Sequence, residues 1–451
     1  MQRNILVLIF SLVAGLTFGQ TSTVTPFSSQ GLGDVTFYGD PINMGLGGSS
    51  VSLIDSSHAN LFNPASYSFT AKGLPLFSMG ITHQESDFSQ DGLAAKDRFT
   101  NLTHFALVVP FGNRFGLGFG LKPFSRTGYE INRSEVVDGD SIFYDYFGRG
   151  EIQEFVVGFS AKIVKNMNHR WSIGANGKRF FGRAENESRA YQRSGLTSTG
   201  VFQQGFFNAA AFGYTLGSVY RYTPSSKHAL TLGAYLRTPQ TLNMRRASTR
   251  VYYGNASNVN SYDTIIPFVS REGSILMPQK MTLGISYEFK PARDSVNRSG
   301  RVPSLLFTAE FTDEQWSNYE ENFDDGFGES FQFFDKMSLR AGFQYIPHRY
   351  INDRSNFVRF YQKWSYRFGA FQVALPYELG GEQIIDRGVT FGLGMPIVLS
   401  RAVSNINFSV VYGDRGLPNN STAFRENYLG FNFGVNIAPS YDRWFVKYKL
   451  D

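Results

Sequence analysis

The stretch MTLGISYEF, residues Met281–Phe289, alternates between two kinds of side chain. Every second residue is apolar or aromatic, and the residues between them are small or polar. The first set is Met281, Leu283, Ile285, Tyr287 and Phe289. Because successive side chains of a β-strand point to opposite faces, the stretch predicts a strand with one apolar and one polar face.

The same alternation recurs along most of the chain. It predicts fourteen strands, an even number, and the connections between them alternate in length. Residues 125–150 and 239–278 are long connections, whereas 111–113 and 223–227 are short turns. The predicted strands are 74–84, 101–110, 114–124, 151–164, 170–181, 206–222, 228–238, 279–290, 302–313, 335–346, 357–373, 386–397, 404–413 and 427–438.

Two fold classes can show such alternation. A soluble β-sandwich would turn the apolar face inward, whereas a transmembrane β-barrel turns it toward lipid. The polar face here is small and weakly charged, and long outer loops with short periplasmic turns are typical of barrels. We therefore predict an all-β protein, an antiparallel transmembrane barrel of about 14 strands spanning residues 74–438. Residues 439–451 would form a periplasmic tail or the end of the last strand.

Composition supports this class and excludes others. The 451 residues include 44 Phe, 24 Tyr and 46 Gly, but charged residues are only 18%. The absence of cysteine excludes disulfides, thiolate metal sites and a lipid-modified N-terminal cysteine. The net charge of +6 is spread along the chain, which argues against nucleic acid as a partner.

The first nineteen residues, MQRNILVLIFSLVAGLTFG, have the pattern of a secretory signal peptide. Arg3 precedes an apolar run from residue 5 to residue 16, which is too short to span a bilayer. Residues 1–19 are therefore expected to be absent from the mature protein. Residues 20–73 would then form a segment before the first strand, either in the periplasm or folded into the barrel lumen.

Within that segment, residues 44–66 read MGLGGSSVSLIDSSHANLFNPAS. A phosphate-binding loop would need Lys and Ser or Thr after the glycines, and neither follows in the required order. Gly45, Gly47 and Gly48 instead suit tight turns in a crowded plug. Asn63-Pro64-Ala65 is compatible either with an ordinary loop turn or with an anchor at the barrel wall.

This motif resembles the N-terminal signature of the FadL-type outer-membrane proteins, in which a Gly-Gly turn and a small acidic stretch precede Asn-Pro-Ala. The pieces GSVYRYTPSSKHALTLGAYLRTP (217–239), LMPQKMTLGISYEF and FTAEFTDEQWSNY resemble strands of the same family in the same order. The C-terminal third is similar to a divergent branch, and the barrel of the type IX secretion shuttle belongs to the same superfamily. The resemblance implies a fourteen-stranded barrel with an N-terminal hatch in its lumen. It also implies passage of hydrophobic molecules such as long-chain fatty acids, with exit through a gap in the wall.

Charged residues also fall on the predicted inward face. The alternation places six there: Lys162, Lys178, Arg237, Glu288, Glu310 and Arg340. A mutually neutralising ladder is one interpretation, because unpaired charge in a restricted interior is costly. In the other, Glu310 pairs with Arg340, and Arg237 or Lys178 is left to meet a ligand carboxylate.

No catalytic arrangement is identifiable. The six histidines are scattered and no pair has metal-ligand spacing, so we expect no enzyme, no metal and no cofactor. An outer-membrane lipase or protease stays an alternative, since triads can assemble across strands. Trp316, Trp364 and Trp444 are expected to lie at the membrane interfaces.

The sequence therefore predicts a multi-pass protein of the bacterial outer membrane. The first hypothesis is passive uptake of hydrophobic or amphipathic, fatty-acid-like molecules through a hatch-plugged lumen. The alternative is an accessory subunit of an outer-membrane protein assembly or secretion complex, with other membrane proteins as partners. A general porin is a third possibility. An apolar lumen pocket of about 300 Å³ or more would favour transport, and a lumen filled by side chains would favour a subunit.

Overall fold

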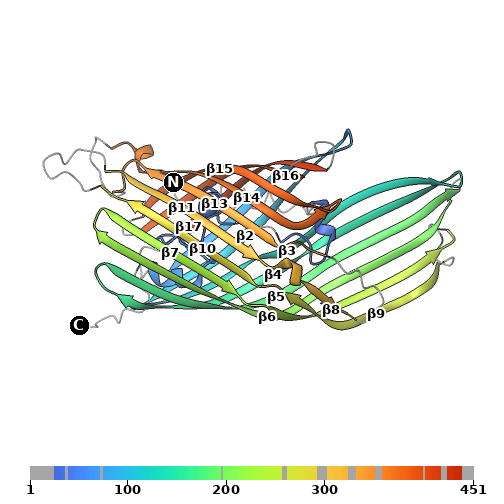
Figure 1. The fold of residues 1–451 in the computed structure, drawn as a ribbon, viewed down its shortest axis with the longest axis horizontal. Helices are drawn as coiled ribbons and strands as arrows, with labels where there is room; N and C mark the ends of the chain where they lie inside the picture. The colour runs from blue at the N-terminus through green and yellow to red at the C-terminus, as the bar shows by residue number, and fades with distance from the viewer. Residues whose placement is uncertain are drawn as a thin grey trace.

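The computed structural model describes residues 25–35, 39–71, 75–194, 197–255, 258, 262–291, 302–323, 332–350, 358–399, 402–417 and 424–438. Its strands form one sheet that closes on itself, because β1 pairs with both β2 and β17 (Figure 1). The predicted signal peptide 1–19 and the tail 439–451 lie outside the described residues. Among the described residues, no helix is long and apolar enough to cross a bilayer.

The sheet contains seventeen strand segments joined mostly by hairpins. They are β1 (Leu76–Gln90), β2 (Leu93–Phe111), β3 (Phe115–Val137), β4 (Asp140–Lys165), β5 (His169–Ser194), β6 (Thr197–Ser225), β7 (His228–Arg237), β8 (Gln240–Tyr253), β9 (Tyr262–Met277), β10 (Lys280–Phe289), β11 (Ser304–Glu314), β12 (Glu320–Asn322), β13 (Lys336–Ile346), β14 (Ser365–Leu379), β15 (Glu382–Leu399), β16 (Ala402–Gly416) and β17 (Arg425–Ile437). The short helices are η1 (Pro26–Ser29), α2 (Pro41–Met44), η2 (Pro64–Phe69), η4 (Trp316–Asn318) and η5 (Phe360–Lys363).

These segments make fourteen barrel strands, as predicted. The chain of β7 continues as β8, β9 continues as β10, and β11 continues as β12. Two of the breaks contain a proline, Pro239 and Pro278, which cannot donate a ladder hydrogen bond. On one side of these two breaks, β7 pairs with β10. On the other side, β8 and β9 pair with each other.

The apolar faces of the strands point away from the barrel interior. On β10, Leu283 is 47% exposed and Thr282 only 4%. The same contrast separates Leu339 at 61% from Ser338 at 3% on β13. A soluble protein buries its apolar side chains, so this inversion is the property of a wall that faces lipid.

Three hairpins extend far beyond the rest of the wall. Strands β3–β6, β8 and β9 run past the ends of the strands on the opposite side, as the teal, green and yellow ribbons show (Figure 1). We call this part the long-hairpin extension; it comprises the described residues within 123–153, 181–210 and 242–275. The prediction that residues 125–150 and 239–278 are loops is therefore wrong, since both ranges are mostly paired strand.

The wall is split where this extension begins. Pairing of β2 with β3 ends at Phe105 and Leu121, and beyond that point β3 pairs only with β4. The N-terminal chain lies along the β3 edge there, because Asp34 forms an antiparallel bridge with Arg126. Arg126 also donates a side-chain hydrogen bond to the Leu102 carbonyl on β2, at 3.1 Å. The N-terminal chain thus covers the edge of β3, and the Arg126 side chain of β3 reaches across to β2.

The interior of the extension's base is aromatic. Trp316 is only 3% exposed and packs against Tyr319 and Phe333, with ring centroids 5.7 and 5.8 Å away. Tyr377 packs against Phe333 and also against Phe27 of the N-terminal chain. The predicted interfacial position of Trp316 is therefore wrong, because this ring lies in a buried cluster inside the wall. Trp444 lies outside the described residues.

Candidate functional site

The N-terminal segment, which we define as the described residues from 25 to 71, contacts strands on several sides of the barrel. The main-chain amides of Ser50 and Val51 both donate to Oε2 of Glu310 on β11, each at 2.7 Å. The hydroxyl of Tyr67 donates to Asn176 on β5 at 3.0 Å. Because β5 and β11 lie in different parts of the closed sheet, the segment occupies the lumen.

The Asn-Pro-Ala sequence forms a helix start that also touches the wall. The side-chain oxygen of Asn63 accepts from the Ala65 amide at 3.0 Å, and Pro64 occupies the first position of η2. The side-chain nitrogen of Asn63 donates to the carbonyls of Val51 at 2.7 Å and Ser218 at 3.3 Å. One side chain therefore caps η2, joins two parts of the segment and reaches β6.

The glycine run brings main chain close to main chain. Gly47 has φ +70°, and a Cβ there would lie 2.5 Å from the Ala370 carbonyl oxygen and 2.7 Å from that of Ala341. Its amide donates to Thr390 on β15 at 3.0 Å. A side chain would be excluded on both grounds, so glycine is required here for close packing against the wall. Gly48 also has a positive φ, whereas Gly45 is right-handed.

A cation-rich cavity of about 100 Å³ lies between the segment and the wall. Carboxylates in it are shared among cations. Glu154 lies 2.5 Å from Lys122 and 3.0 Å from Lys178. Glu314 lies 2.8 Å from Lys280, with two further cations at 3.7 and 3.8 Å. Those further cations are Arg237 and Lys336, and Arg340 contacts Glu310 at 3.3 Å.

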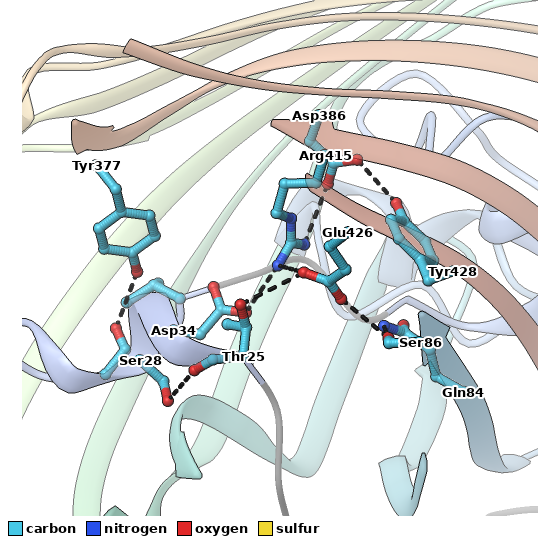
Figure 2. Close-up of polar contacts among 12 residues, drawn as sticks. Thr25, Ser28, Asp34, Gln84, Ser86, Tyr377, Asp386, Arg415, Glu426 and Tyr428 are labelled. Atoms are coloured by element: carbon cyan, nitrogen blue, oxygen red, sulfur yellow. Dashed lines mark hydrogen bonds and ion pairs between the residues drawn. The ribbon is translucent and has the colours of Figure 1, made fainter. Parts of the chain in front are cut away.

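In a second buried cluster, anionic side chains outnumber cationic ones (Figure 2). Arg415 on β16 lies 3.1 Å from Asp386, 3.3 Å from Glu426 and 3.8 Å from Asp34. Tyr428 donates to Asp386 at 2.9 Å. Three carboxylates thus surround one guanidinium, and Asp34 is the only one of the three that comes from the N-terminal segment. The cluster connects the start of the segment to β15, β16 and β17.

A third cluster contains serine, histidine and aspartate. Oδ2 of Asp40 lies 3.4 Å from Nε2 of His58 and 3.5 Å from Nε2 of His104, and Ser78 lies 2.7 Å from that same Nε2 of His104. A catalytic relay needs the carboxylate on the opposite ring nitrogen, but Nδ1 of His104 faces Thr103 at 3.0 Å. The arrangement is therefore not a hydrolytic triad.

Asp40 instead fixes the start of α2. Its Oδ1 accepts the Ile42 amide at 2.7 Å, as an N-cap does. Burial alone would raise the pKa of the Asp40 carboxyl, but His58, His104 and the Ile42 amide together hold it well below its usual range. Asp40 is therefore a buried anion that connects the N-terminal segment to β1 and β2.

The lumen has little free space near the segment. The cation-rich cavity measures about 100 Å³, and a neighbouring cavity next to Gly47 and Arg415 measures about 60 Å³. Pockets for drug-sized apolar ligands are usually ~300–1,000 Å³. In the part of the chain that the structure describes, neither cavity reaches that range.

A large hollow lies outside the lumen, on the long-hairpin extension. It is open, measures about 1030 Å³, and is lined by Arg183, Phe206, Arg245, Phe268 and Glu272 among others. Arg183 stacks over the Phe206 ring at 3.6 Å. Similar stacks join Arg189 to Phe202 and Arg193 to Phe143 on neighbouring strands. Arginine and aromatic side chains are the types enriched in protein–protein interfaces.

The six charged residues predicted to face inward do not form one group. Lys178, Arg237, Glu310 and Arg340 all line the cation-rich cavity, and Glu310 contacts Arg340 as expected. Glu288 instead pairs with Arg221 at 2.6 Å, and Lys162 lies over the Phe69 ring at 4.8 Å. A ligand role for any of them stays a prediction.

Sequence reasoning missed five residues of the same cavity: Lys122, Glu154, Lys280, Glu314 and Lys336. It also missed the clusters around Arg415 and Asp40. Lys122 and Glu154 lie directly opposite each other on β3 and β4, a pairing that alternation alone could have suggested only with the register known.

The fold and the occupied lumen define a class of protein: a closed, fourteen-stranded barrel of the FadL type. The toluene transporter TodX of P. putida is 16% identical, with 90% of this chain and 99% of that chain covered and a TM-score of 0.53. A FadL homologue of Pseudomonas aeruginosa is 13% identical, with 88% and 97% covered and a TM-score of 0.54. The Ralstonia pickettii toluene transporter TbuX is 13% identical, with 89% and 98% covered and a TM-score of 0.53.

At such identities the similarity establishes the fold. No curated protein matches the chain in sequence. The model of the BamG family matches residues 1–451, and the chain therefore belongs to the BamG family.

Proposed function

We propose that this protein is an accessory subunit of an outer-membrane protein assembly complex. The filled lumen carries the proposal: the cavities beside the N-terminal segment measure about 60 and 100 Å³, too small for an acyl chain or a comparable ligand. A barrel whose interior is occupied can still anchor a protein in the membrane and present a surface. Membership of the BamG family supports this function.

The long-hairpin extension supplies the surface. In barrels the longer loops face the outside of the cell, so the extension would project there from the bacterial outer membrane. Its outer face carries Arg183, Arg189 and Arg193 stacked on aromatic rings, and Arg183 also lines the open hollow of about 1030 Å³. We assign the contact with a partner membrane protein to the part of this face that carries the Arg189 and Arg193 stacks.

The test trims the extension at one rung of the sheet. Ile131, Tyr146, Ser188, Gln203, Arg250 and Ile266 are successive neighbours across the six strands. Residues 132–145, 189–202 and 251–265 are each replaced by Asn-Gly, a pair that favours two-residue hairpins. Tagged full-length and trimmed chains are isolated from outer-membrane fractions in mild detergent.

The full-length chain should co-purify with an outer-membrane assembly barrel, and its depletion should lower the amount of folded outer-membrane barrels. The trimmed chain should float with the outer membrane and keep heat-modifiable migration, but lose the partner. A full-length chain that behaves as a lone barrel, with unchanged levels of other barrels after depletion, would contradict the proposal.

A second candidate is passive uptake of hydrophobic, fatty-acid-like molecules. It is supported by the fold shared with two toluene transporters and by the split between β2 and β3, which the N-terminal segment covers. Purified chain in liposomes should then accelerate entry of octanoate over protein-free vesicles, and the variant lacking residues 21–66 should alter that rate. Equal rates with and without protein would exclude this candidate.

A further inference from the structure

Among the described residues, the cation-rich cavity is lined by more cationic than anionic side chains. Six cationic side chains line it: Lys122, Lys178, Arg237, Lys280, Lys336 and Arg340. Three carboxylates line it as well, those of Glu154, Glu310 and Glu314, which leaves a surplus of three positive charges. Charge held away from bulk water is costly unless it is paired.

The carboxylates present are already committed. Glu154 is shared by two lysines, and Glu314 is shared by Lys280, Lys336 and Arg237. Glu314 also accepts from the Trp316 indole at 3.1 Å. Glu310 accepts two main-chain amides of the N-terminal segment in addition to Arg340. None of the three can therefore neutralise the surplus.

The Arg237 guanidinium lacks one hydrogen-bond acceptor among the described residues. Its side chain is buried, with 8% of the residue exposed, and its Nε donates to the Pro278 carbonyl at 3.1 Å. Its Nη2 has no hydrogen-bond partner among the described residues and lies 3.7 Å from Glu314. A buried guanidinium nitrogen without an acceptor is unfavourable, and Arg237 is one of the side chains that line the cavity.

We propose that this cavity binds one small oxyanion of the phosphate or sulfate class, held by Arg237 together with the surrounding lysines. Guanidinium and ammonium groups are the usual ligands of such anions. A volume of about 100 Å³ holds a few water molecules or one small oxyanion and leaves no room for an acyl chain. The anion would join the N-terminal segment, which contributes Ser50, Val51 and Phe62 to the lining, to four or more wall strands.

This inference does not depend on whether the protein acts as a subunit or as a channel. Full-length chain in detergent is titrated with inorganic phosphate, and separately with sulfate, by calorimetry at constant ionic strength. We expect one saturable site per chain. Arg237→Gln should weaken binding by about tenfold or more, since a hydrogen bond to a charged group contributes ~1.5–3 kcal/mol. Lys336→Gln serves in its place if Arg237→Gln does not reach the heat-modifiable folded form.

Lys162→Gln is the matched control. This substitution also removes one positive charge, but Lys162 contacts Phe69 and does not line the cavity. It should bind phosphate as the unmodified chain does. No saturable binding to folded protein, or equal weakening by Lys162→Gln, would overturn the proposal. Octanoate is the third titrant. If it displaced phosphate at similar affinity, the site would belong to the carboxylate of an acyl ligand and the assignment to an inorganic oxyanion would be wrong.

Discussion

At the scale of single residues, Glu310 connects the N-terminal segment directly to the wall. Its carboxylate accepts the Ser50 and Val51 amides and contacts Arg340. Glu310→Gln keeps the shape but removes the charge, so both amide hydrogen bonds become weaker. Amide exchange of residues 46–53 should rise by about tenfold or more, measured by hydrogen–deuterium exchange with mass spectrometry.

The control for this substitution is Glu288→Gln on the neighbouring strand. Glu288 pairs with Arg221 and Lys290 near the short-turn end of the barrel. Its neutralisation should leave exchange of residues 46–53 unchanged. If both variants behaved alike, the segment would be held by packing rather than by the Glu310 carboxylate.

The Asp40 carboxyl makes the stability of the fold depend on pH, and its stabilising contribution is lost as pH falls. Its pKa in the folded protein lies below the ordinary value, so the carboxylate stabilises the fold fully above about pH 4–5. That stabilisation decreases only as pH falls toward the lower, folded pKa. Asp40→Asn should therefore lower the melting midpoint by a similar amount from about pH 8 to about pH 5, with the difference shrinking below about pH 4.

The check is a series of melting curves for both proteins across this range. Comparing the two proteins at each pH isolates the contribution of the Asp40 carboxyl. A difference that grew steadily between about pH 8 and about pH 5 would contradict the assignment of this stabilisation to the Asp40 carboxyl.

At the scale of elements, the break between β7 and β8 depends on a side chain that imitates a strand. Gln240 accepts from the Tyr214 amide at 3.1 Å and donates to the Tyr214 carbonyl at 2.6 Å. Gln240→Ala would leave both main-chain groups of Tyr214 without these partners at an exposed part of the wall. The cost should be about 1–3 kcal/mol of stability, seen as faster exchange at Tyr214 and a lower melting midpoint. Gln192→Ala, at an exposed position of the extension, should change neither.

The elements themselves were predictable to very different degrees. The alternation of Met281–Phe289 is a local pattern. Apolar side chains face lipid and polar side chains face the interior, so the two faces of each strand differ strongly in polarity. All fourteen wall strands could therefore be predicted. Residues 130–137 of β3 are mostly exposed on both faces, which removes the contrast, and this half of the strand was mistaken for a loop. The strands of the extension are stabilised by pairing with one another. The polarity pattern of a single segment does not show which other segments it pairs with.

The candidate site was predictable only in part for a similar reason. Inward direction follows from alternation, which is why Lys178, Arg237, Glu310 and Arg340 were recognised. Which charges meet depends on the register between strands, and that is set by turns and by the breaks at Pro239 and Pro278. The clusters around Asp40 and Arg415 also need the position of the N-terminal segment in the lumen, which no local pattern encodes.

At the scale of the whole molecule, we expect the N-terminal segment to decide whether the barrel conducts. Deletion of residues 21–66 removes most of the described lumen filling while leaving every wall strand intact. The shortened barrel should still insert but become leaky, with ion conductance in planar bilayers well above that of the full chain. The chain with trimmed hairpins keeps the segment and should stay closed. Unchanged conductance after the deletion would refute a plugging role.

The seam between β1 and β17 has a consequence for how this molecule can be made. Residues 25–71 directly precede β1, and β1 is sealed by β17, the last described strand, along a register from Phe77–Ile437 to Ser89–Arg425. The anchors of the segment are distributed over early and late strands, Asn176 on β5 and Thr390 on β15. We therefore expect the segment to take its place while the sheet is still open, before β17 closes the seam.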